Sequence, residues 1–288
     1  MASTIVLKRR INSIKSTRQI TKAMELVSAS KLRRAQEYAN QSKAYHELAQ
    51  ELLVRLSNIN EIESQPLFVK REVKKRLYVV ITSNSGLAGA YNANILKLLT
   101  NDLNQFKGSP SANQIIAIGN KGAQFVRRIR DAELLAFYPS FGDHPTANDI
   151  RPILNTVMDS YKSGNVDEVR LIYTVFNSTI SQSANDMTLL PAHKLETTED
   201  LPTVSNFEPD LETVVDQVTT RLIEAEIWQA VLESLASEHA MRMVAMKNAT
   251  DNAKDLIDDY TLELNTARQA SITQELAEIT GGAEAIQQ

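Results

Sequence analysis

The sequence contains no cysteine and no uninterrupted apolar run of eighteen residues. The first absence excludes disulfides, thiolate nucleophiles and cysteine-ligated zinc or iron–sulfur centres. The second excludes a membrane-spanning helix. The four histidines are scattered with no pair at metal-ligand spacing, so no histidine metal site is expected. With 43% hydrophobic residues, 23% charged residues and a net charge of −4, the 288 residues have the composition of a soluble, folded protein.

Helix breakers are missing from both ends of the chain. All eight prolines and seven of the nine glycines lie within residues 66–209, and the other two glycines are Gly281 and Gly282. Because proline costs about 3 kcal/mol inside a helix, long segments without breakers favour helix. The distribution predicts an N-terminal helix over 1–65, a middle domain over 66–209 and a C-terminal helix over 210–288.

Apolar residues recur every three or four positions in both end segments, as an amphipathic helix requires. The stripe includes Leu7, Ile11, Ile14, Tyr45, Leu48 and Leu52 in the first segment, and Leu222, Ala225, Trp228, Leu232, Leu235, Met246, Ala253 and Leu256 in the second. It is narrow and rich in alanine, which favours a coiled-coil seam over a globular core. Since a domain separates the two segments, the simplest pairing is an antiparallel coiled coil.

The two ends carry opposite charge. Residues 1–38 hold nine Lys or Arg and two Glu, whereas 250–288 hold eight acidic and two basic residues. Opposite fields favour contact between the segments, although individual surface pairs contribute little. The basic stretch is interpreted either as a solvated helix face or as a surface that meets an acidic protein or a nucleic acid. Its first 24 residues also resemble a transit peptide in composition, but the apolar spacing continues past Met24, which favours a structural role.

The middle segment alternates predicted strands and helices. Strands are expected at 76–82, 114–119, 134–138, 169–176 and, at an edge, 187–190, with helices from about 92 to 103, 123–130 and 148–162. This alternation predicts an α/β domain that is Rossmann-like, with a mostly parallel sheet.

Two glycine motifs in this domain invite a ligand-binding interpretation. Gly86-Leu-Ala-Gly89 follows a strand, but it matches neither dinucleotide-binding nor P-loop spacing, so a tight turn that packs a helix close to a strand is favoured. Gly119-Asn-Lys-Gly122 resembles the loop of KH modules, yet its surroundings are not basic. No spacing suggests a nucleophile, general acid or general base, so no catalytic residue is nominated.

Three segments resemble the γ subunit of F-type ATP synthases: residues 11–36, 236–253 and 267–283. The middle matches through Gly86-Leu87-x-Gly89-Ala90-Tyr91-Asn92. Here Ala88 stands where the family commonly has Cys, and Asn84-Ser85 where it commonly has Asp-Arg. The resemblance implies a central rotor shaft whose terminal helices form an antiparallel coiled coil inside a ring of α and β subunits.

The resemblance also implies the partners. The α/β middle domain would be a foot that binds the ε subunit and the membrane rotor ring of c subunits. The chain would bind no cofactor and no nucleic acid, because Mg-ATP and Mg-ADP would occupy sites on β. It would be peripheral on the cytoplasmic face of a bacterial plasma membrane, as part of a proton-translocating synthase.

Contacts with β are carried over from the family residue by residue. Arg268, Gln269, Thr273 and Glu275 match the part of the C-terminal helix that meets a loop of β. Met24, beside Lys22, matches the position that faces an acidic region of β. Further contacts are expected from Arg33, Arg34 and Arg242.

Two other functions remain open on the residues alone. One is a nucleic-acid-binding coiled-coil arm on an α/β enzyme, which predicts salt-sensitive RNA binding by residues 1–38. The other is a Rossmann-like nucleotide-binding domain with helical dimerisation arms, which predicts that the isolated chain binds ATP.

Overall fold

The computed structural model describes most of the chain, namely residues 4–57, 67–69, 71–106, 113–130, 132–142, 145–192 and 211–286. It divides into two compact units, Ala29–Arg242 and the pair of segments Met1–Ser28 with Met243–Gln288. The units are called the α/β unit and the helical unit below. The end of the first predicted helix, residues 58–65, and the predicted boundaries at 66 and 209 lie outside the described residues.

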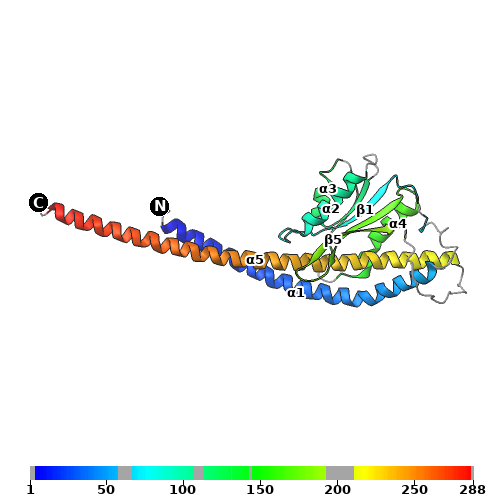
Figure 1. Cartoon of the computed structure of the whole chain (residues 1–288), viewed down its shortest axis with the longest axis horizontal. Coiled ribbons are helices and arrows are strands. Elements are labelled where there is room, and N and C mark those ends of the chain that lie inside the picture. The colour runs from blue at the N-terminus through cyan, green and yellow to red at the C-terminus, as the bar shows by residue number, and fades with distance from the viewer. Residues whose placement is uncertain are drawn as a thin grey trace. The chain divides into compact units, whose positions relative to one another are not determined.

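Two long helices begin and end the chain. Helix α1 spans Thr4–Ser57 and α5 spans Leu211–Ile286, which confirms the two predicted helices. They lie side by side and run antiparallel (Figure 1). The predicted coiled coil is therefore confirmed.

The α/β unit contains one five-stranded sheet in the order β3-β2-β1-β4-β5. The strands are β1 (Arg76–Ile81), β2 (Asn113–Ile118), β3 (Glu133–Tyr138), β4 (Glu168–Phe176) and β5 (Gln182–Leu190). The first four strands are parallel, and β5 pairs with β4 in the antiparallel direction. The predicted Rossmann-like, mostly parallel sheet is confirmed.

Three helices connect the strands: α2 (Tyr91–Gln105), α3 (Asn120–Val126) and α4 (Arg151–Lys162), the last preceded by the short 3-10 helix η3 (Ala147–Asp149). The predicted bounds of the helix over 123–130 are wrong, since α3 begins at Asn120 and ends at Val126. After Val126 the chain forms turns, in which the Arg128 N–H donates to the Phe125 carbonyl. The predicted strand over 187–190 was too short. Its first half is polar and gives no strand pattern, but it completes a hairpin with β4.

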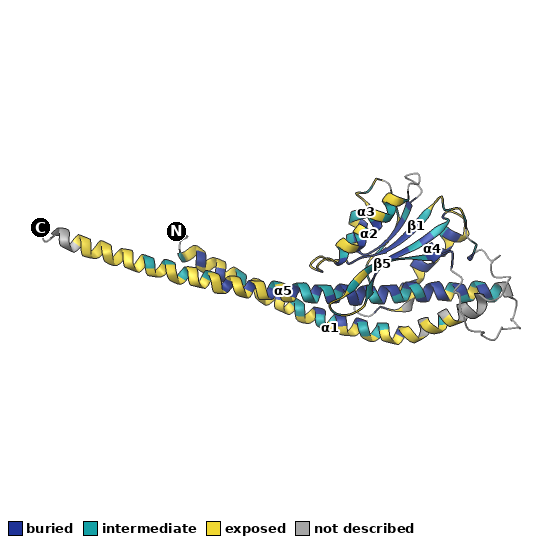
Figure 2. Cartoon of the chain, in the orientation of Figure 1, coloured by how far each residue is buried: buried dark blue, intermediate teal, exposed yellow. Residues whose placement is uncertain are grey.

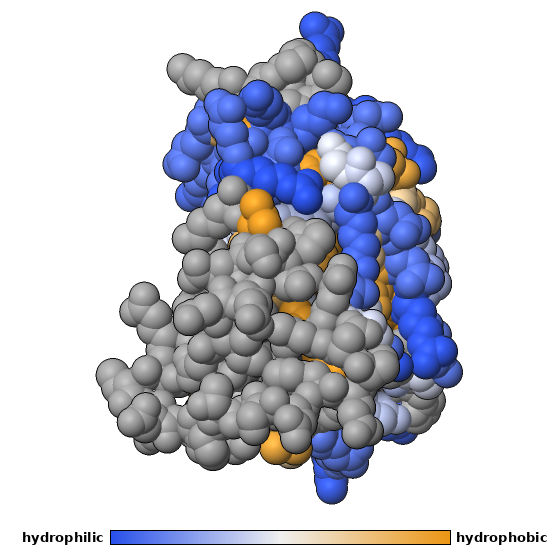
Figure 3. Space-filling model, turned by 90° about the vertical axis from the view of Figure 1, so that its right-hand side faces the viewer, coloured by the Kyte–Doolittle hydropathy of each residue, from blue (hydrophilic) through white to orange (hydrophobic). Residues whose placement is uncertain are grey.

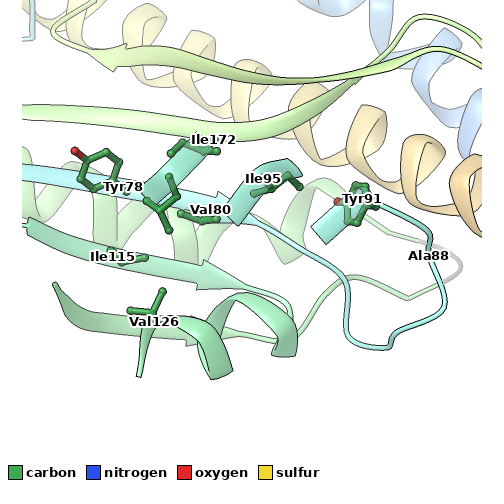
Figure 4. Packing of buried hydrophobic residues seen from close by; sticks show 9 residues of the cluster. Tyr78, Val80, Ala88, Tyr91, Ile95, Ile115, Val126 and Ile172 are labelled. Carbon is green, nitrogen blue, oxygen red and sulfur yellow. The ribbon is translucent and has the colours of Figure 1, made fainter. Parts of the chain in front are cut away.

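Both faces of the sheet are covered. Tyr78, Val80, Ile115 and Ile172 project from the strands into one cluster with buried residues of α2 and α3, among them Tyr91, Ile95 and Val126 (Figure 4). The alternate residues of β1, Leu77 and Val79, are also fully buried, as expected for a parallel sheet between two layers of helices.

Burial divides α5 into two parts. Its residues in the α/β unit are mostly buried, whereas residues 271–280 are all exposed (Figure 2). In the view of Figure 3 the described residues are mainly hydrophilic, and hydrophobic ones appear only in small groups. Among the described residues, no helix combines the length and hydrophobicity needed to cross a bilayer.

Two residues that the periodicity assigned to the helix seam lie outside it. Leu48 is 59% exposed because α1 there lines an open groove with α4 and α5. Leu256 is 46% exposed while Ala253 and Ile257 are buried. A straight helix has 3.6 residues per turn, whereas a strict heptad repeat requires 3.5. The position that faces the partner helix therefore shifts along the helix, and a neighbouring residue takes the place in the seam.

Candidate functional site

The seam of the helical unit combines small, apolar and hydroxyl side chains. Leu7 and Ile11 of α1 are buried, as are Ala253 and Ile257 of α5. In the same seam the hydroxyls of Thr21 and Thr250 are 2.8 Å apart, and both residues are at most 9% exposed. The Arg10 guanidinium lies 5.9 Å from the centre of the Tyr260 ring. These two contacts define the antiparallel pairing of α1 with α5.

This pairing determines how far α5 extends beyond α1. Since Thr21 faces Thr250 and Arg10 faces Tyr260, Thr4 lies near residue 267 of α5. The predicted contact residues Arg268, Gln269, Thr273 and Glu275 therefore follow the paired part of the helix. All four are exposed, and the Thr273 hydroxyl donates to the Gln269 carbonyl at 2.9 Å.

A second predicted group lies on the basic face of α1. Met24 is half-buried, and the Lys22 ammonium pairs with Glu25 at 3.0 Å. Lys22 also lines an open groove, together with Lys15, Arg18, Gln19, Thr250 and Asp251. Because Met24 is opposite residue 247 by the same pairing, about 30 Å of helix separates Met24 from the level of Arg268. The predicted residues of the helical unit thus form two patches.

Arg33 and Arg34 belong to the α/β unit and are exposed. The Arg33 guanidinium makes an ion pair with Glu37 at 3.2 Å, and its side chain is 83% exposed. Arg34 lines a small depression with Tyr38 and His239. Both positions are open to a partner, and the predicted contacts with β stay predictions.

Arg242 differs from the other predicted residues because it is only 8% exposed. Its guanidinium pairs with Glu238 at 2.7 Å and donates to the Ser85 hydroxyl at 3.3 Å and to the Gly86 carbonyl at 3.4 Å. Burial raises the pKa of the Glu238 carboxyl, while the charges of Arg242 and Lys31 act in the opposite direction. Arg242 therefore contacts its own chain, and the predicted contribution to coupling with β is untested.

The sequence did not point to Glu238, nor to a contact between Arg242 and the loop over residues 83–90. A carboxylate four residues before an arginine on a helix is a recognisable signal for the pair. Nothing in the sequence places the loop beside it, because 157 positions separate Ser85 from Arg242.

The loop after β1 is held by its own polar side chains. The Asn92 carboxamide oxygen accepts from the Ser83 amide at 3.0 Å, and Asn84 accepts from the amides of Asn120 and Ser140. Leu87 has a positive φ of 61° and is 63% exposed. The loop is a tight, pre-organised turn between β1 and α2, which agrees with the favoured interpretation of Gly86-Leu-Ala-Gly89.

The second glycine motif is explained by close packing. A Cβ on Gly119, whose φ is +96°, would lie 2.1 Å from the Thr82 carbonyl oxygen. Gly122 N–H donates to the Thr82 hydroxyl at 2.8 Å, and a Cβ there would lie 2.9 Å from that oxygen. The glycines let α3 approach the end of β1.

Arginine and aspartate side chains of α2 and the sheet form a network of ion pairs in the α/β unit. Asp102 of α2 binds the guanidinium of Arg76 at 2.9 Å and that of Arg170 at 3.0 Å, and Arg170 also binds Asp186 at 2.7 Å. Burial raises the pKa of Asp186, opposed by Arg170. Each carboxylate pairs with an arginine, as in a structural network. Among the described residues, no three His, Asp or Glu could together hold a metal.

The fold and these surfaces define a class of protein. It contains an α/β domain and an antiparallel pair of terminal helices, and most of its candidate contact residues lie on exposed helix faces.

Comparison with known proteins gives the family. The family model described as ATP synthase matches residues 3–286. The chain is 40% identical over 289 residues to the ATP synthase gamma chain of Staphylococcus carnosus and 42% identical over 290 residues to that of Macrococcus caseolyticus, with complete coverage of both chains in each case. The chain belongs to the ATP synthase gamma chain family.

Solved structures show the same fold. A chain in the Euglena gracilis mitochondrial ATP synthase, in an OSCP/F1/c-ring structure, gives a TM-score of 0.70 at 20% identity and covers 99% of this chain and 94% of that one. A chain in the Tetrahymena thermophila mitochondrial central stalk and c-ring gives 0.63 at 24% identity, covering 80% and 99%.

Proposed function

We propose that this chain is the central rotor shaft of a proton-translocating F-type ATP synthase. It turns inside a ring of α and β subunits and couples ion flow through the membrane rotor to ATP synthesis or hydrolysis on β. The observation that carries the proposal is the similarity to gamma chains over the complete length, at 40% identity or more.

The mechanism we propose is mechanical. The shaft presents a different face to each β subunit as it turns, and each face binds one conformation of β better than the others. Such differential binding shifts the conformational equilibrium of β. Mg-ATP and Mg-ADP bind on β and react there, and this chain is non-catalytic.

The free end of α5 has the surface that this function needs. Ile272, Leu276 and Ile279 are 47%, 58% and 68% exposed and recur at helical spacing. Exposed apolar residues in a row typically mark a protein contact. These apolar residues support the proposal that surrounding subunits cover this end of α5. The neighbouring polar residues Arg268, Gln269, Thr273 and Glu275 support it too.

The basic groove supports a contact of another kind. Lys15, Arg18 and Lys22 recur on one face of α1, with Asp251 as the acidic member of the lining. Opposite charge on a partner gives orientation and fast association. We assign the groove, with Met24, to the acidic region of β.

The remaining assignments concern the α/β domain and location. We propose that it binds the ε subunit and the c ring, and that the chain is peripheral on the cytoplasmic face of the bacterial plasma membrane through this complex. The c-ring and central-stalk structures with the same fold support that arrangement.

Reconstitution tests the proposal. Purified α and β subunits are mixed with the full chain, and assembly by size-exclusion chromatography and ATPase activity are recorded. We expect a complex of three α, three β and one copy of this chain. Truncation after Asp251, which removes the free end of α5, should weaken assembly or activity.

Charge variants separate the shaft surfaces from the rest of the molecule. Each of the single reversals Lys15→Glu, Arg18→Glu and Lys22→Glu should lower ATPase activity of the complex. The single reversal Lys74→Glu, at an exposed position of the α/β unit, is the matched control. A full chain that remains alone at 32 kDa or as a dimer, and that binds RNA or ATP, would refute the proposal.

A further inference from the structure

A gap opens in the sheet beside β4 where β1 ends. The two strands pair in parallel up to Val80 and Ile172. The same register would place Ile81 opposite Tyr173 and Thr82 opposite Thr174, but the pairing with β4 stops before them. On its other side β1 stays paired with β2, where the Thr82 amide donates to the Ile118 carbonyl at 2.8 Å. The backbone of Thr174 is thus left without a partner strand on that side.

This gap lies at the point where the strand order reverses. From β1 the chain builds β2 and β3 on one side and then returns to place β4 on the other. In open α/β sheets, ligands bind at this switch point, beyond the carboxyl ends of the strands. What occupies the gap therefore decides what the domain can bind.

Helix α5 supplies the missing partner groups. The Ser234 hydroxyl accepts from the Thr174 amide at 3.1 Å, and the Ser237 hydroxyl donates to the Thr174 carbonyl at 3.4 Å. Ser234 and Ser237 are at most 1% exposed. Two helix side chains thus replace a strand neighbour at one residue of β4.

The same face of α5 continues into the Arg242 contacts. Glu238 follows Ser234 by one turn, and Arg242 follows Glu238 by another. The guanidinium holds the loop after β1 through Ser85 and Gly86. The buried Tyr91 at the start of α2 lies within electrostatic reach of Ser234, Glu238 and Arg242. This polar stripe, Ser234, Ser237, Glu238 and Arg242, thereby reaches β4, the loop and α2.

We propose that the polar stripe is a clamp that holds α5 at one height and one rotation in the α/β domain. Apolar packing is non-directional, so alone it permits a helix to slip or turn. A slip of one turn would place Ala230 or Glu238 where Ser234 now bonds Thr174, leaving buried backbone groups unpaired or facing a carboxylate. The clamp ends at Arg242, the last residue of the α/β unit.

The inference deepens the proposed function and rests on it for its consequence. In a rotor shaft, torque that enters through the α/β domain would pass to α5 through this clamp. The clamp itself is a property of the isolated chain and can be tested without the complex.

Hydrogen exchange of the full chain, followed amide by amide, tests the clamp. Ser234→Ala should accelerate exchange of the Thr174 amide at least tenfold, while the amides that pair β4 with β1 up to Ile172 keep their rates. Ser271→Ala, an exposed serine of the same helix, is the matched control and should change neither. An unchanged rate at Thr174, or equal acceleration along all of β4, would overturn the clamp.

A second measurement tests the consequence. In the reconstituted, membrane-bound complex, Ser234→Ala with Ser237→Ala should lower proton pumping per ATP hydrolysed relative to the unsubstituted chain. Unchanged pumping by a complex whose shaft shows the faster Thr174 exchange would refute torque transfer through the clamp. Failure of the unsubstituted chain to assemble would instead refute the proposed function.

Discussion

At the scale of single residues, Gly119 has no substitute. Its φ of +96° and the Thr82 carbonyl beside it exclude a side chain. We expect Gly119→Ala to lower the free energy of unfolding by about 2–4 kcal/mol, because strain and a steric overlap combine. Urea denaturation of the full chain measures this. Gly86→Ala is the control, since no atom lies within 4 Å of its added Cβ. A similar loss from both substitutions would contradict the explanation.

Glu238 makes a pH-dependent contribution. Burial raises the pKa of its carboxyl in the folded state, so the folded protein holds this proton more tightly than the unfolded chain. Stability from this group is present below the unfolded pKa of about 4.3 and is lost as the pH rises through the raised value. We therefore expect wild type to lose stability relative to Glu238→Gln between pH 4 and pH 7. Parallel stability curves for the two proteins would show that the folded pKa is not raised.

At the scale of elements, the arginine–aspartate network joins α2 to the sheet. The Asp102 side chain is 12% exposed, and its carboxylate forms ion pairs with one arginine of β1 and one of β4. Asp102→Ala removes this partner from two mostly buried guanidinium groups, so we expect a loss of about 2–4 kcal/mol in unfolding free energy. Denaturant titration measures it.

An exposed pair on α1 is the control for that substitution. The Lys43 and Glu47 side chains are 67% and 63% exposed and lie 3.7 Å apart. Glu47→Ala should cost no more than about 0.5 kcal/mol, because solvent screens the pair. If both substitutions cost the same, the network contributes no more than a surface ion pair.

At the scale of the whole molecule, α5 has a buried part and an exposed part. Near Ser234 it is buried in the α/β unit, while residues 271–280 are exposed in the isolated chain. A helix without tertiary contacts is marginally stable in water. We expect amides of 271–280 to exchange at least a hundredfold faster than those of 230–240 in the isolated chain.

Assembly should remove that difference. In the complex with α and β, the amides of 271–280 should become protected, because the proposed ring covers Ile272, Leu276 and Ile279. Hydrogen exchange before and after reconstitution measures the change. A segment that exchanges equally fast in the assembled complex would argue against its insertion between subunits.

Local patterns were sufficient for much of the architecture. Proline and glycine distribution located both long helices, and alternating strand and helix signals predicted the parallel sheet, because helix propensity and hydrophobic periodicity act between near neighbours. The first half of β5 escaped detection since Gln182 to Asp186 carry no apolar alternation. Its strand conformation depends on pairing with β4, which is a tertiary contact.

The same distinction between local pattern and tertiary contact applies to the candidate site residues. Arg268, Gln269, Thr273 and Glu275 could be nominated from sequence because the family motif is contiguous. The structure leaves all four exposed, and their contacts with β stay predictions. Arg242 looked like one more member of that surface. Only the tertiary structure shows it beside Ser85 and Gly86, far earlier in the chain, and shows Ser234 and Ser237 at Thr174. Sequence periodicity determines which face of a helix is apolar, but which backbone groups its buried hydroxyls and charges satisfy is decided by the packing of distant segments.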